Sequence, residues 1–107
     1  MKETITIDLN DTKLLKEDAS LISFGAKVKQ MLYYMFAEPG ESLSTFYVKG
    51  NKPDVMAFGA ALASEKAYMD SYLKHGLNDP SVLNNRYRLN KAVEKFERET
   101  GIKWPLK

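Results

Sequence analysis

The chain has 107 residues, the size of one domain with one hydrophobic core, and we expect a single compact domain over residues 1–107. An apolar fraction of 44% and a charged fraction of 28% are ordinary for a globular protein and argue against wholesale disorder. The net charge of +2 is far below that of proteins that bind nucleic acid through charge alone, although basic residues gather toward the C-terminus.

Residue types that carry chemistry are scarce. The chain has no cysteine and a single histidine, His75, which excludes a disulfide framework and disfavours a transition-metal site. No serine has a histidine partner in a recognisable elbow, and no glycine-rich phosphate loop occurs. We therefore expect no catalytic residue, no metal and no cofactor. Without an apolar signal region or a run of apolar residues that could cross a bilayer, we expect a cytoplasmic protein with no membrane contact.

The N-terminal segment predicts a strand and then a helix. Residues 4–9 alternate strictly, with Ile5, Ile7 and Leu9 on one side, as in a half-buried strand. After the strand, a helical turn capped at residues 10–11 and a helix start near residues 18–20 are equal alternatives. The next apolar residues keep helical spacing up to Pro39–Gly40: Leu21, Phe24, Val28, Met31, Leu32 and Met35.

A second strand is predicted over residues 43–49, with Phe46 and Val48 pointing inward. Because a helix separates the two strands, the pattern is a β-α-β unit, which favours parallel pairing. Two strands alone form a marginal sheet with two open edges, so either a strand is missing from this interpretation or a second copy completes the sheet.

The central element is a helix of about 24 residues over positions 51–76. Asn51 is expected to cap its start, Pro53 suits the first turn and Gly76 suits the end. The charged residues Lys66, Asp70 and Lys74 form a narrow strip and are spaced to pair in turn. The wide apolar face contains Val55, Phe58, Ala61, Leu62, Tyr68, Met69, Tyr72 and Leu73.

Glu65 projects from the middle of this apolar face. An unpaired carboxylate there would be costly or would have a raised pKa. The expected explanations are a pair with an Arg, Lys or Tyr at the edge of the core, a residue that contacts a partner protein, or a catalytic acid, for which no second acid or base is near in the sequence.

Small residues form a ridge on the reverse side of the same helix, and we call them the small-residue ridge. They are Ala57, Ala60, Ser64, Ala67 and Ser71. A one-sided surface helix would carry lysines and glutamates at these positions, so the ridge predicts a second packing partner, in the same chain or in a second copy. Alanine is also the best helix former, and a ridge that simply faces water is the alternative. Together with the open sheet edges, the ridge favours a homodimer.

A third helix comes next, with Asp79 as its cap and Pro80 at its first position. Val82, Leu89, Val93 and Phe96 form its apolar stripe, and Gly101 is expected to end it with Ile102 folded back in a Schellman motif. Its basic, asparagine-rich start suits nucleic acid or an acidic partner, although a solvated surface is the plainer interpretation. The residues of this start are Asn84, Asn85, Arg86, Arg88 and Lys91.

Aromatic residues outside these stripes are candidates for an interface. Tyr33 and Tyr34 cannot both point inward, and Trp104 lies in a short tail that either packs beside Ile102 or contacts a partner. We assign Tyr34, Glu65 and Trp104 to a protein interface. The ending over residues 96–105 resembles the ends of small bacteriophage accessory proteins, a resemblance that implies no residue role.

The predicted fold is an α+β domain with the order β-α-β-α-α, in which three helices pack on a small sheet that a second copy could complete. The predicted function is a non-enzymatic protein-interaction module, a regulator or adaptor that forms a homodimer and binds another protein. The alternative function is nucleic-acid binding through the third helix.

Overall fold

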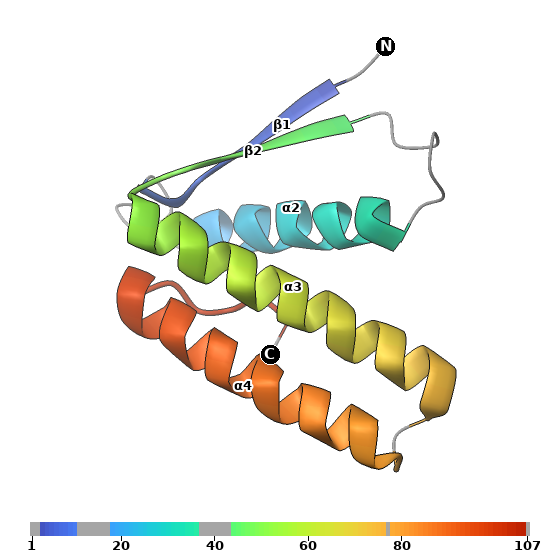
Figure 1. Cartoon of the computed structure of the whole chain (residues 1–107). Coiled ribbons are helices and arrows are strands. Elements are labelled where there is room, and N and C mark those ends of the chain that lie inside the picture. Colours follow the sequence, from blue (N-terminus) through green and yellow to red (C-terminus); the bar gives the residue numbers. More distant parts are fainter. Residues whose placement is uncertain (1–2, 11–17, 37–43, 77, 107) are drawn as a thin grey trace.

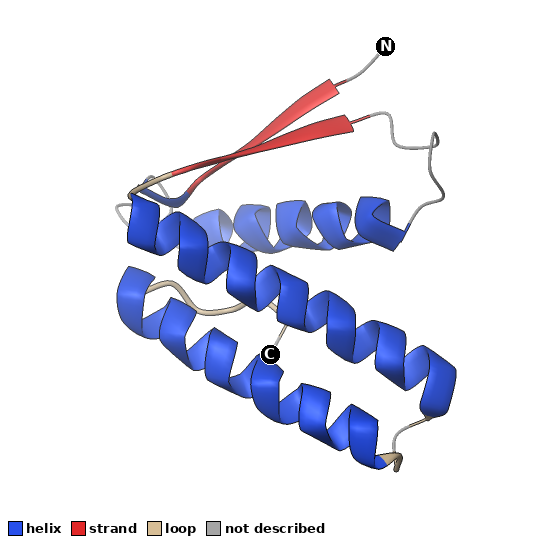
Figure 2. Cartoon of the chain, in the orientation of Figure 1, coloured by secondary structure: helices blue, strands red, loops and turns tan. Residues whose placement is uncertain are grey.

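The computed structural model describes residues 3–10, 18–36, 44–76 and 78–106. Within them the chain has an α+β fold in which three helices pack with a small parallel sheet (Figures 1 and 2). The helical turn predicted to be capped at residues 10–11 would fall within residues 11–17, which lie outside the described part of the chain. The elements are β1 Glu3–Asp8, α2 Asp18–Phe36, β2 Ser44–Lys49, α3 Lys52–His75 and α4 Pro80–Thr100.

The sheet consists of β1 and β2, which pair in parallel as the β-α-β pattern predicts. Ile5 stands opposite Phe46 and Ile7 opposite Val48, so the apolar residues of both strands share one face. Helix α2 runs along that face in Figure 1. The Lys27 ammonium of α2 donates to the Thr6 carbonyl oxygen at 2.9 Å and links the helix to β1.

Helix α3 has the predicted length of 24 residues and Asn51 is its N-cap, as predicted, but the Asn51 side chain makes no capping hydrogen bond. The Asn51 carbonyl accepts from the Val55 N–H at 2.9 Å, while its side chain makes no capping bond. A capping side chain bonds the N–H of the second or third helical residue, and the second is Pro53, which has no N–H. Helix α4 differs because its proline, Pro80, comes first. There Asp79 accepts from the Ser81 N–H at 2.9 Å.

Helix α4 ends at Gly101, with φ 73°, as the sequence predicts. The ending is an αL motif and not the expected Schellman motif. The Gly101 N–H donates to the Glu97 carbonyl at 2.8 Å, and the Ile102 N–H donates to the Thr100 hydroxyl oxygen at 3.1 Å. In a Schellman motif the Ile102 N–H would bond a helix carbonyl, so the Thr100 side chain replaces that acceptor.

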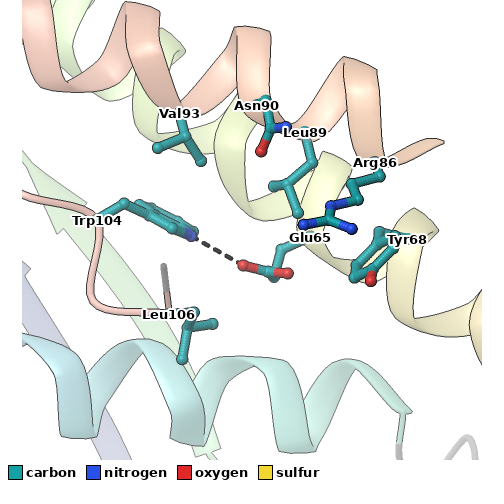
Figure 3. Close-up of a pocket in the computed structure, with 8 residues that line it drawn as sticks. All are labelled: Glu65, Tyr68, Arg86, Leu89, Asn90, Val93, Trp104 and Leu106. Atoms are coloured by element: carbon teal, nitrogen blue, oxygen red, sulfur yellow. Dashed lines mark hydrogen bonds between the residues drawn. The ribbon is translucent and has the colours of Figure 1, made fainter. Parts of the chain in front are cut away.

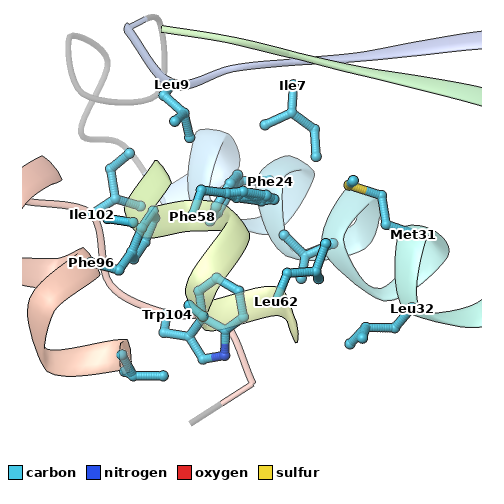
Figure 4. Close-up of a cluster of buried hydrophobic side chains, with 14 of the residues drawn as sticks. Ile7, Leu9, Phe24, Met31, Leu32, Phe58, Leu62, Phe96, Ile102 and Trp104 are labelled. Atoms are coloured by element: carbon cyan, nitrogen blue, oxygen red, sulfur yellow. The ribbon is translucent and has the colours of Figure 1, made fainter. Parts of the chain in front are cut away.

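After α4 the chain turns back and inserts residues 101–106 between the three helices, where Ile102 and Trp104 are buried (Figure 4). The Trp104 ring lies 5.3 Å from the Phe96 ring of α4 and 6.0 Å from the Phe58 ring of α3. On the α2 side, a Cβ on Gly25 would lie 3.1 Å from the Pro105 Cβ, so the absence of a side chain lets this segment approach closely. The C-terminal segment is therefore part of the core.

Candidate functional site

Glu65 and Trp104 are brought together by the C-terminal segment, although they are 39 positions apart in the sequence. The Trp104 Nε1–H donates to the Glu65 Oε1 at 2.9 Å, and the two side chains are only 4% and 3% exposed. The partner of Glu65 is thus an indole, and not the Arg, Lys or Tyr expected from the sequence. For Trp104 the structure selects the alternative in which the tail packs back onto the core beside Ile102.

The pair lies in a cleft of about 300 Å³ between α3, α4 and the C-terminal segment, which we call the Glu65 cleft (Figure 3). Its lining is Glu65, Tyr68, Arg86, Leu89, Asn90, Val93, Trp104 and Leu106. Arg86 and Asn90 are exposed, whereas Glu65 and Trp104 are buried. The inner part of the cleft is therefore formed by Glu65 and Trp104, and its solvent-exposed part by Arg86 and Asn90.

Burial raises the pKa of the Glu65 carboxyl, because removal from water penalises the charged form, and the Trp104 hydrogen bond opposes this only in part. Arg86 lines the same cleft, yet no ion pair within 4.0 Å joins it to Glu65. Carboxylate oxygens offer about four acceptor positions. Within the described residues one of them has a donor, so the carboxylate can still accept hydrogen bonds.

The third residue assigned to a protein interface, Tyr34, lies apart from this pair. It is half-buried on α2, with its ring 5.6 Å from the Phe46 ring of β2 and 5.5 Å from the Tyr33 ring. Tyr33 is 72% exposed, so the two tyrosines do not both point inward, as predicted. Tyr34 thus stabilises the contact between α2 and the sheet.

The structure divides the basic start of α4 between two sides of the helix. Arg86 lines the Glu65 cleft, and Arg88, two residues on, points about 200° away around the helix. The Lys91 ammonium lies 5.5 Å from the centre of the exposed Tyr87 ring, and Asn84 is exposed while Asn85 is half-buried. Asn84, Arg88 and Lys91 are spaced four and three residues apart and share one side of the helix, whereas Arg86 lies on the other side, so a groove-reading face would include only part of this set.

The small-residue ridge is divided between core and surface. Ala57 and Ser71 are buried, Ser64 is half-buried, and Ala60 and Ala67 are exposed. Packing within the chain therefore accounts for part of the ridge without a second copy.

Near the start of α3 the ridge forms one wall of a groove of about 420 Å³ between α3 and α4, which we call the alanine groove. The residues that line it are Lys52, Pro53, Met56, Ala57, Ala60, Ala92, Lys95 and Glu99. Met56 beside it is 64% exposed.

Four exposed large apolar side chains come from the two helix ends where α3 and α4 are joined, and we call them the hairpin-end patch. Its members are Tyr72, Leu73, Leu83 and Tyr87, which are 43%, 72%, 54% and 61% exposed. They come from the last turn of α3 and the first two turns of α4, the two helices that make the most extensive contact in the fold. Tyr87 directly follows Arg86, so the patch adjoins the Glu65 cleft along α4.

Comparison with protein-family models, curated proteins and solved structures finds no match to the chain. The resemblance of residues 96–105 to phage accessory proteins has no support from these comparisons and carries no argument. None of the helices in the described ranges combines the length and apolar character needed to cross a membrane. The same residues contain no group of three His, Cys, Asp or Glu side chains that could hold a metal ion.

Sequence reasoning selected Glu65, Trp104 and Arg86 but missed the remaining walls of the cleft. Leu89 and Val93 were assigned only to the core, and Asn90 and Leu106 had no role. Their shared signal is helical spacing, because Arg86, Asn90 and Val93 lie three and four residues apart on α4. Nothing in the sequence pattern shows that this side of α4 faces Glu65.

Proposed function

We propose that the protein is a small, non-enzymatic interaction module that binds another protein through the hairpin-end patch and pairs with a second copy of itself. The observation that carries the binding role is the grouping of large exposed apolar side chains around one helix connection. Single exposed apolar residues are normal on monomeric proteins, whereas contiguous ones mark interaction surfaces.

The position of the patch supports this role. The joined ends of α3 and α4 lie away from the sheet and from α2 in Figure 1, so a partner could approach them without displacing either. Two of the four side chains are tyrosines, which combine a large apolar ring with a hydroxyl and are frequent interface anchors. The other two, Leu73 and Leu83, are more than half exposed.

Basic residues near the patch indicate the character of the partner. On α4 the patch residues Leu83 and Tyr87 have basic neighbours in the sequence: Arg86, Arg88 and Lys91. On α3 Lys74 directly follows Leu73 and pairs with Asp70 at 3.3 Å. A partner with apolar residues surrounded by acidic ones would complement this surface. The partner we infer is thus an acidic protein surface.

The test is affinity capture from the native cell with matched variants. We expect the wild-type chain to retain a partner that the double variant Leu73→Asp, Leu83→Asp loses, because a carboxylate at each position would be buried unpaired in the interface. Ile22→Asp is the control, since Ile22 is 72% exposed on α2 and remote from the patch in sequence. Equal retention by the double variant would disprove the role of the patch.

Nucleic acid is scored in the same capture, with and without nuclease treatment. If nucleic acid were the partner, retention would fall after nuclease and with rising salt, and Arg88→Gln would weaken it. We expect neither effect, because Arg86 lines the Glu65 cleft and does not share a helix face with Arg88 and Lys91.

A further inference from the structure

The Glu65 cleft contains two opposite charges that are not paired with each other. Glu65 is 4% exposed, and Arg86 lines the same cleft beyond ion-pair distance. Remaining unpaired with each other stabilises neither side chain. A buried carboxylate is stabilised by a cationic or polar donor, and a guanidinium is suited to a carboxylate. A ligand that carries both charges would satisfy both groups at once.

We propose that the Glu65 cleft binds a free amino acid with an apolar side chain. In this arrangement the ligand ammonium donates to the Glu65 carboxylate, and the ligand carboxylate accepts from the Arg86 guanidinium. The amide of Asn90, beside Arg86 in the lining, provides a further donor for that carboxylate. The site adjoins the hairpin-end patch but does not depend on that patch binding a protein.

The remaining walls determine which amino acids fit. Leu89, Val93 and Leu106 supply aliphatic surface in Figure 3, so they favour an apolar ligand side chain over a charged one. The volume of about 300 Å³ is at the small end of ligand pockets and suits one amino acid better than a nucleotide.

The orientation of the Glu65 side chain in the cleft is fixed by a neighbouring residue. The Trp104 indole donates to one carboxylate oxygen and holds the side chain in the cleft at 2.9 Å. This fixed orientation is an advantage for binding, because a ligand does not have to order the side chain. Its indole ring forms a wall of the cleft beside the carboxylate (Figure 3).

Trp104 is the only tryptophan of the chain, so tryptophan fluorescence reports on this one residue, whose indole lines the cleft. The experiment titrates the full chain with L-leucine, L-methionine, L-phenylalanine, L-lysine and L-glutamate and follows tryptophan fluorescence and melting temperature. We expect saturable changes in both with the apolar amino acids and weaker ones with lysine and glutamate. If no amino acid changes either signal at millimolar concentration, the proposal is wrong.

Two leucine analogues test each charge separately. Leucinamide lacks the carboxylate and 4-methylpentanoate lacks the ammonium, and we expect each to bind about tenfold or more weakly than leucine, the effect of one charged hydrogen bond. Equal binding of either analogue would remove the corresponding residue from the site.

The matched variants are Arg86→Gln, Glu65→Gln and, as control, Arg88→Gln. Arg86→Gln and Arg88→Gln change the same charge on exposed positions of α4, so a difference between them reports on the cleft. We expect the dissociation constant for leucine to rise about tenfold or more in Arg86→Gln and Glu65→Gln and to stay unchanged in Arg88→Gln. Unchanged binding in Arg86→Gln, which is exposed and should fold normally, would overturn the proposal even if Glu65→Gln were unstable.

Discussion

At the scale of single residues, Glu65 has two opposite effects. Its burial disfavours the charged carboxylate, and its hydrogen bond with Trp104 anchors the C-terminal segment. Burial raises its pKa above the value of 4.5 expected in the unfolded chain. The folded state therefore holds the proton more tightly, so the contribution of Glu65 to stability is fully present below pH 4.5 and is lost as the pH rises through the folded pKa. This dependence runs opposite to that of a salt-bridged carboxylate.

Glu65→Gln should remove that dependence. The Gln amide oxygen can still accept from the Trp104 indole, and no charge is buried at any pH. We expect the free energy of unfolding of Glu65→Gln to gain on that of the wild type as the pH rises from 4.5 toward neutral. Urea denaturation of both proteins across that range measures the difference. A difference that shrinks with rising pH would show that the Glu65 carboxylate is stabilised by a charged partner.

At the scale of elements, the end of α4 allows a comparison between two glycines. Gly101 has φ 73°, a conformation that costs other residues about 1–2 kcal/mol, so Gly101→Ala should destabilise the protein by roughly that amount. Because the C-terminal segment starts at Gly101, this change should also shift Trp104 from its buried position. Gly59→Ala is the control, because Gly59 is helical with open space around it, and that change should stabilise by about 0.5–1 kcal/mol.

Urea denaturation and the Trp104 fluorescence spectrum distinguish the two variants. We expect a more solvent-exposed tryptophan signal in Gly101→Ala and an unchanged one in Gly59→Ala. If both variants were equally stable, Gly101 would not be required for the αL ending.

The same elements show why the sequence predicted the helices and strands better than the site. Strand alternation and the Asp79–Pro80 start of α4 depend on residues a few positions apart, so a local pattern contains them. The Trp104–Glu65 hydrogen bond and the approach of Pro105 to Gly25 join residues 39 and 80 positions apart. No local preference encodes such contacts, because they form only after α2, α3 and α4 have packed.

At the scale of the whole molecule, homodimer formation stays a prediction, and the structure indicates where to test it. The exposed part of the small-residue ridge near Met56 lines the alanine groove, whose rim carries Lys52, Lys95 and Glu99. Two copies related by a two-fold axis could place Met56 of each in the groove of the other. The rim then offers lysines of one copy to the glutamate of the other, as a self-complementary interface requires.

Ala60 and Ala67 provide a matched pair for this test, because both are exposed alanines of α3 and only Ala60 lines the groove. We expect light scattering at micromolar concentration to show a wild-type dimer, a monomer for Ala60→Arg and a dimer for Ala67→Arg, since an arginine at position 60 fills the groove. A wild type that stays monomeric would refute the homodimer. A dimer that survives Ala60→Arg would instead require another contact, for which the open edges of the two-stranded sheet are the next candidate, because their backbone groups can pair with a second chain.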